Sequence, residues 1–176
     1  MSRARYHHWA NAQLNDFLLA VDHDGGFAVR EDVRENVRQA LAHTMTVDGL
    51  WLDRLEGSNH ASTSQRRFAA LDLDGMLKAR TLLDARLMAA VQRIGPVASD
   101  ETVEAANGLR IGLTSVVRFM LARNQRQRSR IAAMLTELNL TPPLIGVQLF
   151  ESRSQKQTAR PATSRSIDSR MLVAVG

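Results

Sequence analysis

The stretch RFMLARNQRQRSRIAAM, residues 118–134, decides how this chain folds, because its periodicity is helical and its inner face is interrupted. One stripe, spaced by three or four residues as on one side of an α-helix, comprises Val116, Met120, Arg123, Gln127, Ile131, Met134 and Leu138. Its apolar members predict a helix that faces a core. Arg123 and Gln127 are polar and one turn apart, so we expect a polar partner or a ligand to meet the helix there.

The predicted helix begins near Thr114 or Ser115, either of which is a suitable N-cap, and ends near Leu140, before Pro142 and Pro143. Three earlier helices are predicted over residues 2–21, 33–55 and 73–94, the last capped by Asp72. Together these segments indicate a bundle of four antiparallel or parallel helices, which buries one stripe of each.

Two connections distinguish this bundle. Residues 58–71 are polar and long enough to cross one end of it. Residues 102–113 contain Asn107-Gly108 between two short alternating segments, which predicts a β-hairpin with a type I′ turn. The predicted fold class is therefore all-α: a four-helix bundle with a long crossover between helices 2 and 3 and a small β-hairpin before helix 4.

Charge and composition divide the chain of 176 residues into residues 1–151, the bundle, and residues 152–176, a basic Ser/Arg-rich flexible tail. Of the net charge of +5, the tail carries +4, so the body is nearly neutral. A nucleic-acid-binding domain would concentrate positive charge on its folded body. The chain has no cysteine, and we find neither a signal peptide nor a long apolar run. We therefore expect a cytoplasmic protein with no membrane partner.

Several segments resemble the DinB/YfiT-like family. They are the opening ARYHHWANAQLNDFLLAV, then LAHTMTVDGLWLDRLEG at residues 41–57, and RQRSRIAAMLTELNLTPPLIGVQLF near the end. The similarity covers about residues 3–150. It implies the bundle described above, frequent pairing as a homodimer, and a divalent metal such as zinc or nickel held by three histidines. One metal ligand would lie on the second helix and two on the fourth, in the spacing His-x-x-x-His.

By this resemblance the three ligand positions fall on His43, Arg123 and Gln127. Arginine cannot ligate a metal, and glutamine is a poor zinc ligand. The other histidines, His7, His8, His23 and His60, have no spacing that forms a replacement triad. We therefore expect His43 to be a vestigial metal ligand, and no cofactor to be bound unless other residues complete a zinc or nickel site with His43.

Function is predicted as a choice among three hypotheses. The first is a non-catalytic, stress-related DinB-like protein in which His43, Arg123 and Gln127 bind a small anionic ligand in the former metal pocket. The second is a metal-dependent thiol transferase or hydrolase of the DinB/YfiT-like type. The third is weak binding of nucleic acid or an acidic partner through the basic tail.

Ordinary structural roles compete with these hypotheses. Arg123 could instead form a salt bridge with Asp48 or Asp16, or reach solvent. His43 could be a hydrogen-bonded core histidine. The remaining arginines of the fourth helix, Arg118, Arg126, Arg128 and Arg130, are predicted to form a solvated face.

Overall fold

The computed structural model describes residues 3–58, 64–95, 101–105 and 107–158. It divides the chain into two units, residues 1–145 and residues 146–176. The first unit contains the bundle. The predicted boundary at residue 151 lies inside a helix of the second unit.

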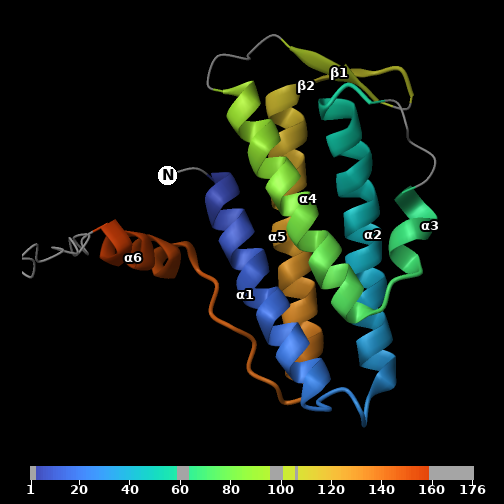
Figure 1. The fold of residues 1–176 in the computed structure, drawn as a ribbon, viewed down its shortest axis with the longest axis vertical. Coiled ribbons are helices and arrows are strands. Elements are labelled where there is room, and N and C mark those ends of the chain that lie inside the picture. The colour runs from blue at the N-terminus through green and yellow to red at the C-terminus, as the bar shows by residue number, and fades with distance from the viewer. Residues whose placement is uncertain (1–2, 59–63, 96–100, 106, 159–176) are drawn as a thin grey trace, which may run out of the picture. The chain divides into compact units, whose positions relative to one another are not determined.

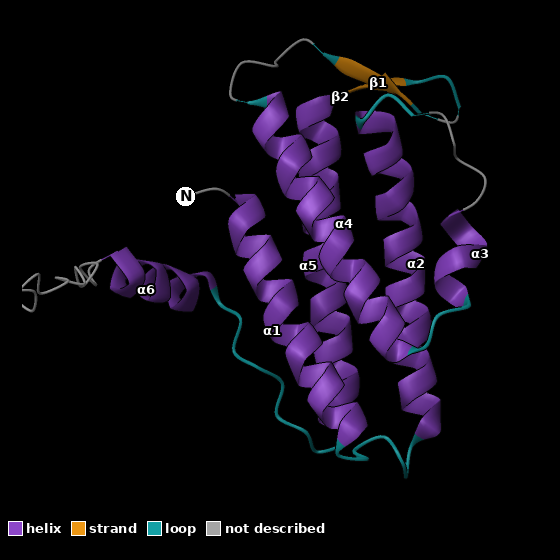
Figure 2. Cartoon of the chain, viewed as in Figure 1, coloured by secondary structure: helices purple, strands orange, loops and turns teal. Residues whose placement is uncertain are grey.

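Four long helices form the bundle (Figure 1): α1 (Arg3–His23), α2 (Glu31–Leu55), α4 (Leu73–Ile94) and α5 (Leu113–Glu137). The course of the chain in Figure 1 shows that α1 and α5 run in one direction and that α2 and α4 run in the other. The crossover between α2 and α4 allows these two consecutive long helices to be parallel. The structure confirms the predicted all-α four-helix bundle (Figure 2).

The crossover contains a short helix that the sequence did not predict, α3 (Ser64–Ala69). Arg38 of α2 fastens the end of this connection, because its Nη1 donates hydrogen bonds to the carbonyl oxygens of Ala69, at 2.6 Å, and Leu71, at 3.2 Å. The side chain of Phe68 also belongs to the hydrophobic core. The crossover is therefore packed against α2 at this end.

The core lies between the four helices and is built mainly from the apolar side chains of their inner faces. Its largest fully buried apolar side chains are Leu18, Phe27, Val37, Met45, Leu52, Leu73, Met76, Leu87, Met120, Ile131 and Leu135. Burying an aliphatic or aromatic side chain of this size stabilises the fold by about 1.5–3 kcal/mol. Asp48 is buried as deeply as these residues, with 1% of its surface exposed.

Individual residues in the sequence mark the start of α4 and the position of the hairpin. The carboxylate of Asp72 accepts a hydrogen bond from the backbone N–H of Gly75 at 2.8 Å, which confirms the predicted N-cap. The hairpin is also confirmed, with β1 (Thr102–Glu104) paired antiparallel to β2 (Arg110–Gly112). These strands lie across one end of the bundle (Figure 1).

The predicted type I′ turn is wrong. Gly108 has a positive φ of 79°, but Asn107 does not. The backbone N–H of Gly108 donates to the carbonyl oxygen of Ala105, and the N–H of Ala105 donates to that of Leu109. Of the described residues between Ala105 and Leu109, Gly108 has the left-handed conformation.

The start of α5 also differs from the prediction. Gly112, the last residue of β2, is the N-cap, and no side chain caps the helix. The N–H of Leu113 donates instead to the carbonyl oxygen of Glu101 at 3.0 Å. Because the hairpin supplies this acceptor, the helix begins one residue before Thr114.

The second unit contains α6 (Val147–Thr158). This helix begins before the predicted tail and includes its first residues, 152–158. The rest of the tail, residues 159–176, lies outside the described residues. No helix in the described ranges has the length and apolar composition that a membrane crossing requires.

Candidate functional site

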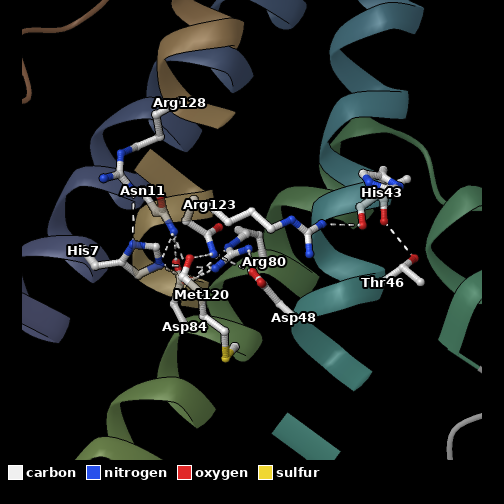
Figure 3. Close-up of polar contacts among 12 residues, drawn as sticks. His7, Asn11, His43, Thr46, Asp48, Arg80, Asp84, Met120, Arg123 and Arg128 are labelled. Carbon is white, nitrogen blue, oxygen red and sulfur yellow. Dashed lines mark hydrogen bonds and ion pairs between the residues drawn. The ribbon is translucent and has the colours of Figure 1, made fainter. Parts of the chain in front are cut away.

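The middle of the bundle contains a group of seven buried polar side chains, which we call the polar network. Every long helix contributes to it: His7 and Asn11 from α1, Asp48 from α2, Arg80 and Asp84 from α4, and Asn124 and Arg128 from α5. None of these residues has more than 5% of its surface exposed. Figure 3 shows six of them converging from facing helices.

Arg80 is the centre of the polar network and pairs with two carboxylates. Its Nη1 donates to Oδ2 of Asp48 at 2.6 Å, and its Nε donates to Oδ1 of Asp84 at 2.9 Å. Arg80 Nη2 also donates to the same Asp84 oxygen. Arg80 and Asp84 are four residues apart on α4, so they share one helix face. Such a pair is tolerable in a core only when hydrogen bonds compensate for the lost solvation.

The electrostatic balance favours the charged forms of this group. Burial alone raises the pKa of Asp84, but the charge of Arg80 and hydrogen bonds from His7 and Arg80 outweigh it and hold that pKa at about 2. Burial likewise lowers the pKa of Arg80, and the charges of Asp84 and Asp48 outweigh this effect and raise it. Both groups therefore stay ionised at neutral pH.

Two asparagines complete the hydrogen bonding of the carboxylates. The amide of Asn11 donates to both oxygens of Asp84, at 3.0 and 2.8 Å. The amide of Asn124 donates to Oδ2 of Asp48 at 2.8 Å. Asn11 also accepts a hydrogen bond from Nη1 of Arg128 at 2.8 Å. The network thus links α1, α2, α4 and α5 through hydrogen bonds between side chains.

His7 lies within this network as a neutral base. Its Nδ1 accepts from Nη1 of Arg128 at 3.1 Å, since an arginine in a protein does not lose its proton. The other ring nitrogen, Nε2, lies 3.4 Å from Oδ1 of Asp84, 3.0 Å from Nδ2 of Asn11 and 3.4 Å from Nη2 of Arg80. Burial lowers the pKa of His7, and the hydrogen bond to Asp84 only partly opposes this. With His7 neutral, the two carboxylates balance the charges of Arg80 and Arg128.

Arg128 is buried, contrary to the prediction that it belongs to a solvated face. Its guanidinium carbon lies 5.9 Å from the centroid of the Tyr6 ring, a cation–π distance. Burial lowers its pKa, and the charges of nearby acids do not fully compensate. The hydroxyl of Tyr6 donates to the carbonyl oxygen of Ile145 at 2.6 Å. This contact ties the segment after α5 to α1.

A cavity of about 20 Å³ lies beside the network, with Asn11, Asn15, Thr44 and Gln127 among its lining residues. The amide nitrogens of Asn15 and Gln127 are buried and have no hydrogen-bond partner in the structure. A polar cavity of this size has room for about one water molecule. It cannot hold a substrate.

The inner face of α5 differs from the predicted stripe. The buried residues are Leu113, Val116, Met120, Asn124, Arg128, Ile131 and Leu135. The prediction was therefore right at Val116, Met120 and Ile131 and wrong at Arg123 and Gln127. Of its last members, Met134 and Leu138 are only partly buried, and Leu135 is the buried residue. From Met120, steps of three and of four are both helical, and apolar periodicity does not distinguish Arg123 from Asn124. Asn124 is the residue that faces inward, and its amide donates a hydrogen bond to the carboxylate of Asp48 on α2.

The three predicted site residues lie in different surroundings. His43 is exposed on α2, and Figure 3 shows its ring directed away from Arg123. Nη2 of Arg123 donates to the main-chain oxygen of His43 at 3.1 Å. Gln127 is partly buried and lines the small cavity. The expected salt bridge of Arg123 with Asp48 or Asp16 is not among the ion pairs of the described residues, because Asp48 pairs with Arg80.

Sequence reasoning missed most of the polar network. A signal was present, because His7-x-x-x-Asn11 and Arg80-x-x-x-Asp84 each place two polar residues on one helix face. In α1, His7 and Asn11 continue into Leu14 and Leu18 at helical spacing, so they belong to the apolar stripe. Polar pairs on such stripes of different helices indicate a buried network.

The fold and the network define the chain as a four-helix bundle whose hydrophobic core contains a buried polar network. Over residues 1–159 the sequence matches the DinB family, and the chain belongs to this family. No curated protein and no solved structure matches the chain.

The residues at the family's expected ligand positions do not fit a metal ion. Arg123 is a permanent cation without a lone pair to donate, and its guanidinium contacts the main chain of α2. His43, the one histidine of the set, is exposed. Within the described ranges, no three His, Cys, Asp or Glu side chains are grouped so that they could hold an ion.

Proposed function

We propose that this chain is a non-catalytic DinB-family protein that has lost the three-histidine metal site and binds a small anion beside Arg123. One observation carries the proposal. Arg123 is a partly buried cation, and no carboxylate of the described residues lies within ion-pair distance of it. An inorganic oxyanion or a small carboxylate would supply the missing charge.

The surroundings of Arg123 favour an anion. Burial lowers its pKa, and the charge of Asp48 only partly opposes this, so the guanidinium is desolvated without a full counter-charge. It remains protonated, because arginine does not titrate near neutral pH. The guanidinium has five N–H groups, and one bond, to the carbonyl oxygen of His43, is formed. Arginine binds carboxylate and phosphate oxygens through such a fork of donors.

The other two predicted residues have supporting roles. The carbonyl of His43 orients the guanidinium from α2. Gln127 lies one turn after Arg123, and its amide nitrogen has no partner. It is a neutral donor that faces the small cavity, so a bound anion would reach it through a water molecule.

The engagement of the ionisable core groups supports the absence of catalysis. Asp48 and Asp84 are bonded to Arg80 and to asparagines, and His7 is 2% exposed. A general base needs contact with the substrate proton. These groups are buried and bonded to one another, which favours a structural role for them.

The two alternatives have less support. A metal-dependent thiol transferase or hydrolase needs a Lewis acid to activate its thiol or water. The resemblance to the family places Arg123 where a metal ligand would be expected. Binding of nucleic acid or an acidic partner through the tail depends mainly on residues 159–176, which the structure does not describe.

The test is thermal unfolding in sodium sulfate and in sodium chloride at equal ionic strength. A ligand that binds only the folded state raises the unfolding temperature with its concentration. We expect sulfate to raise the unfolding temperature of the native protein more than chloride does. Arg123→Ala should lose this difference, and Arg130→Ala, which removes an exposed arginine of the same helix, should keep it.

An equal sulfate effect in Arg123→Ala and in the native protein would refute the site. A second experiment tests the lost metal. After purification without chelator, mass spectrometry should find no stoichiometric zinc or nickel in the native protein. The variant Arg123→His/Gln127→His places imidazoles at i and i+4 and should retain about one ion per chain. A stoichiometric ion in the native protein would revive the enzyme hypothesis.

A further inference from the structure

A second pocket lies on another side of the bundle, between the start of α1, the end of α4 and the start of α5. Its volume is about 340 Å³, against about 20 Å³ for the cavity beside the polar network. Small-molecule sites have volumes of about 300–1,000 Å³. This pocket is therefore large enough for a small organic ligand.

The pocket exists because α1 is short at this end. Figure 1 shows that α1 begins below the level that α4 and α5 reach. Apolar side chains in the last turns of α4 and the first turns of α5 therefore lack a facing helix. Val91, Ile94, Val117 and Leu121 are only partly buried there, and they line the pocket. They form an apolar floor that is continuous with the core.

Two cations border this floor. Arg3 from α1 and Arg118 from α5 both line the pocket and both are exposed. Neither forms an ion pair with any acid that the structure describes, and no acidic residue is part of the lining. By contrast, Arg86 of α4, which is partly exposed, pairs with Asp53 and Glu56.

We propose that this pocket binds a small amphipathic carboxylate, with its hydrocarbon part on the apolar floor and its carboxylate between Arg3 and Arg118. The hydrocarbon would cover apolar surface that now contacts water, which favours binding through the hydrophobic effect. The arginines would supply donors to both carboxylate oxygens. A cation of the same shape would meet two like charges. The hydroxyl of Thr114, at the edge, is a further polar group for the head.

This inference does not depend on the site at Arg123. The two sites differ in their lining, since Arg123 is absent from this pocket. They also differ in the proposed ligand, which is a small anion at Arg123 and an amphipathic carboxylate here. Sulfate is the probe for the site at Arg123, and octanoate is the probe here.

Isothermal titration calorimetry on the full chain tests the proposal with octanoate and with octylammonium, which has the same chain and the opposite charge. We expect octanoate to bind at one site per chain and octylammonium to bind at least tenfold more weakly. Arg118→Ala should weaken octanoate binding about tenfold, and Arg130→Ala and Arg123→Ala should leave it unchanged. Arg118 is exposed, so its removal should not alter folding, which circular dichroism checks.

A second variant tests the floor. Val117→Trp should fill the pocket and abolish octanoate binding while Arg118 remains. The proposal is overturned if octanoate does not bind the native protein. It is also overturned if octylammonium binds equally well, if Arg118→Ala binds as tightly as Arg130→Ala, or if a folded Val117→Trp variant keeps its affinity.

Discussion

Two arginines of this bundle, Arg80 and Arg123, have opposite surroundings. Arg80 is fully enclosed and bonded to two carboxylates, which raise its pKa. Arg123 is partly enclosed, is bonded to one carbonyl oxygen, and has a pKa that burial lowers. The first guanidinium is satisfied by the protein, so its role is structural. The second still has unused donors, so it is the one available to a ligand.

The largest expected effect comes from removing the satisfied arginine. Arg80→Met leaves the carboxylates of Asp48 and Asp84 buried without a cation, which should cost about 3–5 kcal/mol of unfolding free energy. Urea denaturation followed by circular dichroism measures it. Arg86→Met is the matched control, because it removes a partly exposed ion pair of the same helix and should cost at most about 1 kcal/mol. Similar losses in both variants would mean that the network is not the stabilising element.

Arg128 lies between the two extremes, because it is buried but its close partners are neutral. Arg128→Met leaves Nδ1 of His7 and Oδ1 of Asn11 without donors, at a cost of about 1–3 kcal/mol. The substitution also removes the free-energy cost of burying the Arg128 cation. The net loss in urea denaturation should therefore be smaller than that of Arg80→Met. A larger loss would show that charge balance with Asp84 outweighs the burial of Arg128.

The polar network should also make stability depend on pH through His7. Its pKa in the folded protein is below the ordinary value of 6.5, so the unfolded chain binds the proton more readily. The stability from His7 is therefore present above pH 6.5 and is lost as the pH falls toward the lowered pKa. The loss approaches about 1.4 kcal/mol per pH unit for one group. Urea denaturation between pH 5 and 8 measures it.

His7→Gln should flatten this slope even if it lowers stability at every pH. His43→Gln, at an exposed position, should keep the slope of the native protein. The groups that face His7 are Asp84, Arg80 and Arg128, and all three keep their charge over this pH range. An unchanged slope in His7→Gln would assign the pH dependence to another group.

Much of the fold could be predicted because its signals are local. The bounds of α4 and its cap at Asp72 follow from periodicity and one side chain, and both are confirmed. The hairpin follows from Gly108, whose positive φ is a property of a single residue. The helix α6 was not predicted, since residues 152–158 lack the apolar periodicity that indicates a packed helix.

The candidate site was less predictable because it depends on contacts between distant segments. After Met120, helical spacing allows either Arg123 or Asn124 to be the next residue that faces the core. The choice depends on Asp48, 76 residues earlier in the chain, which Asn124 bonds. Four arginines close together on one helix indicate a solvated face, so the sequence predicts an exposed Arg128. The structure shows that this side chain is buried. Its acceptors lie on α1, and nothing local to α5 indicates them.

The smallest expected effect on stability comes from removing the unsatisfied arginine. Arg123→Met deletes one hydrogen bond to the main chain of α2 and relieves the desolvation of a cation, so the two changes nearly cancel. Its unfolding free energy should lie within about 0.5 kcal/mol of the native value, as for most partly exposed substitutions. If Arg123→Met instead destabilises the protein as much as Arg80→Met does, Arg123 is a structural residue and the contrast between the two arginines fails. If Arg123→Met leaves the unfolding free energy unchanged and also loses the sulfate effect, Arg123 contributes to binding and not to folding. The protein then keeps at Arg123 a desolvated charge that its fold does not need.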